Sequence, residues 1–434
     1  MNPEFRRQLW LGFSSTRLAV LPVLLLACFA AAYLTGKDTG KESAALVLAI
    51  TGAALFAVLV WGMGTLAAGT SVMEEVADRT WDQQRMSAMQ PWAMTWGKLG
   101  GASAYGWYGG ALCLLVAVPA AVMSGHGAQI AQATSSAILF GLFLQALLMA
   151  VSLQLVKTGG PLSRRVGVWP LVAVLLWGVV PLLNMAREPM VLWWGQSFNR
   201  LNFGLTSLAL FTLCALVSAW RSMAEVLAVR QLPWGWPALA LLITVYLSGF
   251  APAYPLATFG LVGLISCAAL TFFALLTEPQ PRPLWQRVVT RLSGGQWRAA
   301  LLQLPRWPTT LVLAVPFALI ASVSLSQPVA MRWPAATQIM LHPITFMLLM
   351  VRDCALALFF AFAVKNKRAV ATFLLLMLVL YGMLPLLAGA VGGEVLLALA
   401  QPLLVNSKLS IVVAAVHAGL ALSLLGWRWR ATGR

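Results

Sequence analysis

Acidic residues are rare in this chain, and a third of them gather in one short segment. Residues 71–82 hold four of the chain's twelve acids, which are Glu74, Glu75, Asp78 and Asp82. Three of them recur every four residues, which predicts that they line one face of a helix. Glu75 and Arg79 have the i, i+4 spacing of a favourable ion pair on a neighbouring face. The chemistry that this spacing offers is charge complementarity toward a partner.

Such a helix is too charged to lie in lipid, so we expect it at the end of a helical bundle. Its acids would meet a basic surface, and Trp81 or Trp92 would add an aromatic anchor. The alternative is a solvated turn between two spans that binds nothing.

A second polar feature is Arg352-Asp353, which lies within an apolar stretch. Each charge at the centre of a bilayer costs at least about 2.5–3.5 kcal/mol, so both need partners or water. Adjacent residues point about 100° apart on a helix, which predicts that they do not fully satisfy each other. The pair is a structural ion pair with neighbouring helices, a pair whose side chains snorkel to the membrane interface, or part of a polar pathway.

The sequence has few residues whose spacing suits catalysis or metal binding. His126, His342 and His417 lie in different segments without ligand spacing. The five cysteines all fall in apolar stretches, form no C-x-x-C motif and suggest neither a disulfide framework nor a metal site. We expect no catalytic residue, no metal and no cofactor in this chain.

The sequence contains two strings that partly resemble nucleotide-binding motifs. The string closest to a phosphate loop, at 64–71, lacks the lysine and is apolar. Leu292-Ser293-Gly294-Gly295-Gln296 spells the signature string of ATP-binding-cassette ATPases. Without a phosphate loop or room for an ATPase domain, we interpret it as a coincidence, so the chain is not expected to be an enzyme.

The composition of the chain indicates the environment in which all of these residues lie. The chain has 434 residues, of which 60% are hydrophobic and 9% charged, with a mean hydropathy of +0.84. Soluble domains carry about 25% charged residues, so we expect an all-α polytopic membrane protein. Apolar runs predict about twelve spans, with ten or eleven also compatible, at 18–34, 44–70, 99–121, 135–156, 168–184, 204–220, 237–251, 255–276, 309–326, 344–364, 370–390 and 409–427.

The distribution of basic residues predicts the orientation of these spans. With the N-terminus inside, most of the 29 Lys and Arg residues fall on the cytoplasmic side, and the C-terminus is then also cytoplasmic. The net charge of +17 is therefore an orientation signal, and no nucleic-acid partner is expected. Asn2-Pro3-Glu4 predicts the start of an interfacial helix before the first span, with a basic orientation flank as the compatible alternative.

The segment that follows the second span resembles the permease subunits of ATP-binding-cassette exporters of the type-two export class. The matching residues are Ser71-Val72, Glu75, Arg79-Thr80-Trp81-Asp82, Ser87, Pro91-Trp92 and Gly97-Lys98-Leu99. The amphipathic N-terminal helix is similar to that of the same family, so the resemblance covers roughly the first hundred residues. The chain departs from the family pattern in its number of predicted spans, because members of the family typically have six per subunit.

The resemblance implies a function, a partner and a location. Segment 71–98 would be the cytoplasmic coupling segment that docks a separate ATPase subunit, and that subunit, often dimeric, would hold ATP and Mg²⁺. Residues 1–220 would form a first six-span bundle, and 221–434 an added or duplicated half, beside a possible second permease copy. The protein would export an unidentified substrate across a bacterial-type inner (plasma) membrane.

Two other functions remain open on the sequence alone. One is a partner-independent secondary carrier that uses Arg352 and Asp353. The other is a membrane scaffold that transports nothing.

Overall fold

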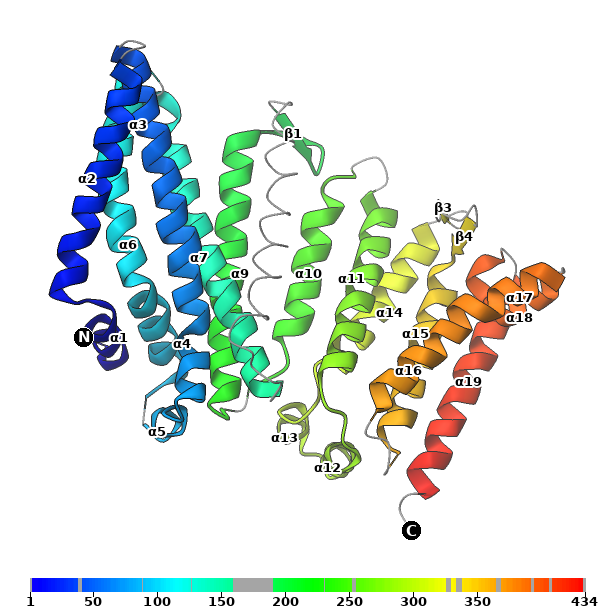
Figure 1. Ribbon diagram of the computed structural model, residues 1–434. Coiled ribbons are helices and arrows are strands. Elements are labelled where there is room, and N and C mark those ends of the chain that lie inside the picture. Colours follow the sequence, from blue (N-terminus) through cyan, green and yellow to red (C-terminus); the bar gives the residue numbers. More distant parts are fainter. Residues whose placement is uncertain are drawn as a thin grey trace. The chain divides into compact units, whose positions relative to one another are not determined.

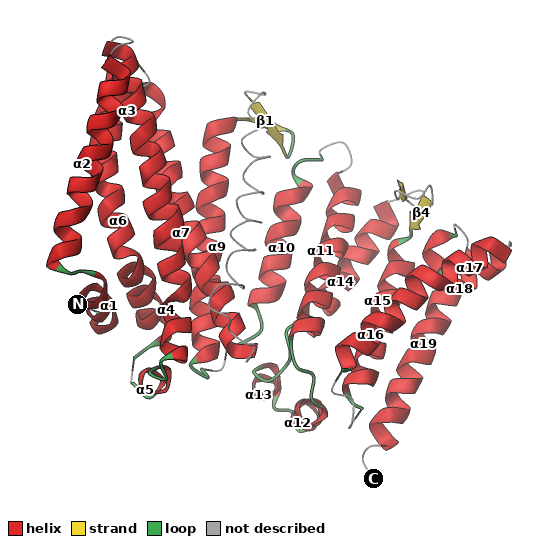
Figure 2. Ribbon diagram, in the orientation of Figure 1, coloured by secondary structure: helices red, strands yellow, loops and turns green. Residues whose placement is uncertain are grey.

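The computed structural model shows a protein built almost entirely of helices (Figure 1). The structure describes residues 2–37, 41–87, 89–125, 127–158, 190–229, 231–251, 255–324, 329–332, 338–363, 368–391, 394–405 and 408–431. The fold is 86% helical, which confirms the all-α class. Figure 2 shows short strand pairs as the exceptions; they are β1 (Met190–Trp193) with β2 (Gln196–Asn199) and β3 (Val329–Arg332) with β4 (Gln338–Leu341).

Ten helical segments among the described residues are long and apolar enough to cross a membrane, which confirms a polytopic membrane protein. The predicted span at 168–184 lies outside the described residues. The predicted span at 237–251 corresponds to α10 (Gly235–Ser248), which has 14 residues. At about 1.5 Å per residue it reaches roughly 21 Å, short of the roughly 30 Å hydrocarbon core. Which side of the membrane holds the termini stays a prediction.

The chain divides into two compact units. Unit 1 comprises Met1–Val191 with Ser197–Gln231, and unit 2 comprises Leu192–Gln196 with Leu232–Arg434. That residues 221–434 duplicate the first half stays a prediction.

Unit 1 is a bundle of long helices with two short ones at the end where the N-terminus lies (Figure 1). Its helices are α1 (Pro3–Gly12), α2 (Ser15–Lys37), α3 (Lys41–Phe56), the π-helical η1 (Ala57–Gly64), α4 (Thr65–Ala77), α5 (Trp81–Arg85), α6 (Pro91–Met123), α7 (Gly127–Thr158) and α9 (Arg200–Val226). Residues 44–77 run through α3, η1 and α4 as one continuous span. The core between α4, α6, α7 and α9 is filled by Val72, Met94, Leu153 and Met223.

A buried side-chain hydrogen bond accompanies the π-helical segment η1. A π-helix shifts the backbone pairing, so a carbonyl within the span needs another donor. The buried Gln145 supplies one, because its Nε2 donates to the Val60 carbonyl over 3.2 Å. Its Oε1 accepts from Trp107 Nε1 at 3.0 Å. A Cβ on Gly64 would lie 2.8 Å from Gln145 Nε2, so the glycine makes room for this amide.

Unit 2 contains long apolar helices, several shorter helices and the strand pair β3–β4. After α10 its helices are α11 (Pro255–Thr277), α12 (Arg282–Ser293), α13 (Trp297–Leu301), α14 (Trp307–Ser324), α15 (Pro343–Ala361), α16 (Ala369–Leu378), the π-helical η2 (Val379–Met383), α17 (Leu384–Val391), α18 (Glu394–Ala400), the 3-10 helix η3 (Pro402–Leu404) and α19 (Lys408–Ala431). Leu264, Phe317 and Met350 fill the core between α11, α14 and α15.

The string Leu292–Gln296 forms the end of α12. Gly295 has a φ of +72°, a conformation that glycine adopts at little cost. The Gln296 amide donates to the Arg291 carbonyl over 2.9 Å, and the Gly295 amide donates to the Leu292 carbonyl over 3.1 Å. These bonds form a Schellman-type helix cap, which accounts for the glycine at position 295.

Candidate functional site

The acidic segment of the sequence folds as a helix end, a turn and a second short helix. Helix α4 ends at Ala77 and α5 begins at Trp81. The prediction that Glu74, Asp78 and Asp82 line one face of a single helix is therefore wrong. In Figure 1, α5 is seen nearly end-on, so it lies across the direction of α4.

Arg79 makes the turn between α4 and α5. Its φ is +59°, in the left-handed region that costs a residue with a Cβ about 1–2 kcal/mol. The Thr80 amide donates to the Glu75 carbonyl over 2.9 Å, and the Arg79 amide donates to the Val76 carbonyl over 3.2 Å. The strained turn ends α4 and sets the direction of α5. It also removes Arg79 from the helical face on which a pair with Glu75 was predicted.

Glu75 instead belongs to a charge network that joins α1, α4 and α6 and is buried except at Arg7, whose side chain is 39% exposed. The network consists of Glu4 and Arg7 from α1, Glu75 from α4 and Lys98 from α6. Lys98 Nζ lies 3.0 Å from Glu4 Oε1 and also pairs with Glu75. Arg7 Nη2 lies 2.8 Å from Glu4 Oε1 and also pairs with Glu75. The Lys98 side chain is 0% exposed, so this ion-paired ammonium group is completely buried.

Two carboxylates and two cations make the charge network neutral, which is the condition for burying charges. Gln8 Nε2 adds hydrogen bonds of 3.0 Å to Glu4 Oε1 and 3.3 Å to Glu75 Oε1. Burial alone would raise the pKa of Glu4, but Arg7, Lys98 and Gln8 together hold that pKa below its usual value. Glu4 is therefore ionised at neutral pH.

The network requires that α1 and α6 approach closely, and glycines on α6 allow this. A Cβ on Gly97 would lie 2.7 Å from Glu4 Cβ, and one on Gly101 would lie 2.5 Å from Gln8 Cβ. The predicted N-terminal helix is confirmed, with Asn2 as its N-cap. Its polar face, however, packs against the protein, while Trp10 and Leu11 are exposed.

The aromatic residues of the segment have different environments. Trp81 is 5% exposed and packs in the core of unit 1, with Lys98 Nζ 5.5 Å from its ring centroid. Trp92 is 49% exposed, and its ring packs edge-on against Trp96 and Trp220. Pro91 occupies the first turn of α6. Of the two predicted anchors, Trp92 is the one that reaches the surface.

The exposed part of the segment carries Glu74, Asp78, Arg79, Thr80 and Asp82. We call its three acids, Glu74, Asp78 and Asp82, the acidic surface. The Asp82 side chain is 83% exposed, and its Oδ1 lies 3.8 Å from Arg85 Nη1. The predicted site residues thus separate into a buried group, Glu75, Trp81 and Lys98, and an exposed acidic surface beside it.

Arg352 and Asp353 form a second polar cluster, in unit 2. Both are buried in α15, and Arg352 Nε donates to Asp353 Oδ1 over 2.8 Å. Tyr381, in the π-helical η2, donates its hydroxyl to Asp353 Oδ2 over 2.6 Å. Arg352 Cζ lies 5.1 Å from the Tyr381 ring centroid, and Arg352 Nη1 lies 3.5 Å from His417 Nδ1 of α19. Three spans therefore contribute to the cluster.

Sequence reasoning missed several partners in both places. In the sequence, Glu4 marks a helix start and Arg7 is one of many basic residues near the first span, so neither indicates an ion-pair network. His417 falls within the predicted span 409–427, and a histidine inside a span is the available signal for the second cluster. His126 lies outside the described residues, and His342 precedes α15. No metal-binding group of three His, Cys, Asp or Glu residues occurs in the described part of the chain.

Comparison of the chain with protein-family models, curated proteins and solved structures finds no match.

Proposed function

We propose that this protein is the membrane permease subunit of an ATP-binding-cassette exporter of the type-two export class. A separate cytoplasmic ATPase subunit docks on the acidic surface and hydrolyses ATP with Mg²⁺. The observation that carries the proposal is α5, a short helix that lies across the bundle between two long spans and presents Asp82. The polarity of this exposed segment suits a protein partner better than lipid.

The charge network supplies a route from the docking segment into the membrane. Trp81 of α5 contacts the Lys98 ammonium group, and Lys98 pairs with Glu75 of α4 and Glu4 of α1. Because these charges are buried, separating them is costly, so α1, α4 and α6 move as one body when α5 moves. ATP binding to the partner would shift these three helices together. The shift would change the side of the membrane to which the pathway between the spans opens.

The wider assembly follows the same proposal. The ATPase subunit is a dimer, a second permease copy or unit 2 completes the pathway, and the complex resides in a bacterial-type inner membrane. The substrate is not identified.

A second candidate function rests on the cluster of Arg352, Asp353, Tyr381 and His417. Ionisable residues within the membrane are typical of ion and substrate pathways, and this buried charge pair has partners from three spans. This function requires no soluble partner. Purified chain in liposomes would then accumulate substrate along an ion gradient without ATP.

Charge reversal on the acidic surface tests the docking proposal. Asp78→Lys with Asp82→Lys should weaken binding of the ATPase subunit by about tenfold or more, because complementary charges at an interface become repulsive. Trp81 is left unchanged, since it belongs to the core. The ATPase is identified by co-purification from native membranes as a soluble chain with a phosphate loop, and its affinity and ATP hydrolysis are then measured with each variant.

Asp78→Glu with Asp82→Glu retains the charge and should bind normally. Gln286→Lys adds a positive charge on the exposed side of α12 and should also leave binding unchanged. Unaltered affinity and ATP hydrolysis in the charge-reversed variant would show that the partner docks elsewhere or is absent.

A further inference from the structure

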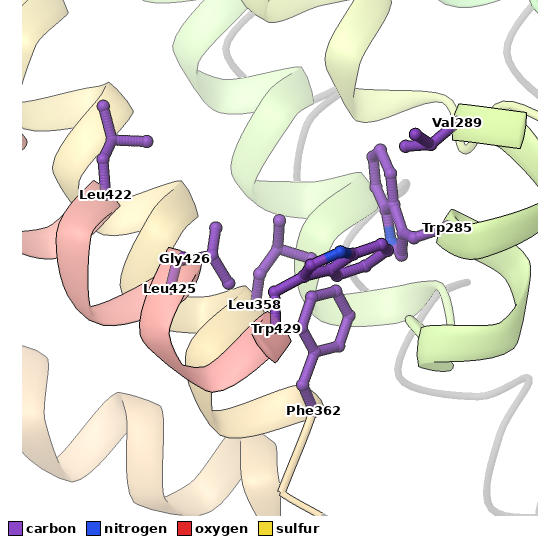
Figure 3. Close-up of a pocket in the computed structure, with 8 residues that line it drawn as sticks. All are labelled: Trp285, Val289, Leu358, Phe362, Leu422, Leu425, Gly426 and Trp429. Carbon is purple, nitrogen blue, oxygen red and sulfur yellow. The ribbon is translucent and has the colours of Figure 1, made fainter. Parts of the chain in front are cut away.

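Unit 2 contains an apolar pocket of about 360 Å³ between α12, α15 and α19. Figure 3 shows its lining, in which the Trp429 ring of α19 reaches toward Trp285 of α12. Phe362, which directly follows α15, and Gly426 of α19 contribute further walls. Ligand pockets in proteins have volumes of about 300–1,000 Å³, so this space is large enough for part of a small amphiphile.

The aromatic walls are held in place by their own contacts. Trp285 Nε1 donates to Gln280 Oε1 over 3.2 Å, and the Trp285 ring packs against Trp307 with centroids 5.6 Å apart. The centroids of Phe362 and Trp429 are 5.7 Å apart. The bonded indole nitrogen of Trp285 and the packing of these rings fix the walls around the apolar space.

Arginines border this pocket. Arg282 Nη2 donates to the Trp429 carbonyl over 2.7 Å, and its Cζ lies 5.5 Å from the Trp429 ring centroid. Arg428 Cζ lies 5.2 Å from the ring centroid of Phe359, the neighbour of a lining residue. Arg287 and Arg430 are exposed on the same two helices. Helices α12 and α19 contain no Asp or Glu, so every charged side chain on these two helices is basic.

We propose that this pocket is a binding site for an anionic phospholipid. One acyl chain fills the apolar space between α12, α15 and α19, and the phosphodiester of the head group lies at Arg282 and Arg428. Arginine pairs well with phosphate oxygens, and basic pockets between membrane helices are suited to anionic head groups. A neutral lipid carries no net negative charge to pair with the arginines, and a peptide would find few hydrogen-bond partners on the apolar walls. The site is independent of any ATPase partner.

Lipid selectivity provides the first test. The purified full chain is titrated with phosphatidylglycerol or with phosphatidylcholine of the same acyl chains, and bound lipid is counted by native mass spectrometry. We expect phosphatidylglycerol to bind about tenfold more tightly, since the nearby arginines attract its negative charge. Equal affinities for the two lipids would mean that the pocket makes only non-selective contact with lipid, which would overturn the proposal. Displacement of the lipid by inorganic phosphate alone would overturn the role of the acyl chain.

Two pairs of variants then locate the site. Gly426 lines the pocket, and a Cβ there meets no atom within 4 Å, so Gly426→Phe should fill the space without disturbing the fold. Gly419→Phe is the matched control, because this position on α19 is equally open and lies outside the pocket lining. Gly426→Phe should lower phosphatidylglycerol affinity about tenfold, while Gly419→Phe should leave it unchanged. Equal effects of the two would contradict the assignment.

Arg282→Gln should remove most of the preference for phosphatidylglycerol and leave phosphatidylcholine binding unchanged. Arg298→Gln, an exposed arginine of α13, removes the same charge away from the pocket and should preserve the preference. A preference retained in Arg282→Gln but lost in Arg298→Gln would place the head group elsewhere.

Discussion

Replacing Lys98 with Met should destabilise unit 1 by about 3–5 kcal/mol, the cost of removing one partner from a buried charge network. The side chain is completely buried, and its ammonium group pairs with both Glu4 and Glu75. Without it, two carboxylates would share Arg7 alone. The loss is measured by denaturant unfolding in detergent micelles, with the proteolytic accessibility of α1 as a local readout.

Two further variants give this prediction its controls. Arg85→Met removes a cation that faces Asp82 at the surface and should cost less than about 1 kcal/mol. Combining Lys98→Met with Glu75→Gln restores neutrality, so the double variant should be more stable than Lys98→Met alone. If the two losses simply added, the network would not be the source of the stability.

Replacing Asp353 with Asn should destabilise unit 2 by about 3 kcal/mol, because it leaves Arg352 buried without a counter-charge. Arg352→Met should cost a similar amount, since Asp353 would then be the uncompensated charge. The variant that carries both changes buries no charge and should be more stable than either single variant. Thermal unfolding of all three proteins in one lipid or detergent mixture measures the coupling.

Tyr381→Phe is a milder change in the same cluster. It removes one hydrogen bond to a charged group and should cost about 1.5–3 kcal/mol. Additive losses for Arg352→Met and Asp353→Asn would contradict the ion pair.

The Asp353→Asn protein also separates the two candidate functions. An exporter driven by its partner would keep ATP-dependent transport, whereas a carrier that couples through Asp353 would lose gradient-driven transport.

Local signals along the chain predicted local structure well. Asn2-Pro3-Glu4 correctly marked the start of α1, where Asn2 Oδ1 accepts from the Glu4 amide over 3.0 Å. Apolar runs placed the long spans because lipid requires about 20 apolar residues to cross it. The single-helix prediction for 74–82 failed because Arg79 adopts a left-handed conformation, which charge spacing does not reveal.

Contacts between distant segments could not be predicted from local sequence patterns. Glu4, Glu75 and Lys98 meet only after three helices pack, and the spacing of each along its own helix gives no sign of the others. The same holds for Asp353 and Tyr381, which come from different spans. Sequence reasoning did predict that Arg352 and Asp353 would need further partners, and the structure supplies Tyr381 and His417.

The most direct test of a docked ATPase is a cross-link from position 82. Asp82→Cys is introduced into a chain whose five native cysteines are replaced with Ser, and intact cells are treated with a short bifunctional reagent. We predict modification from the cytoplasmic side and a covalent adduct with a soluble subunit that carries a phosphate loop. Modification only from the outer side, or cytoplasmic modification that never yields such an adduct while transport continues, would contradict the account.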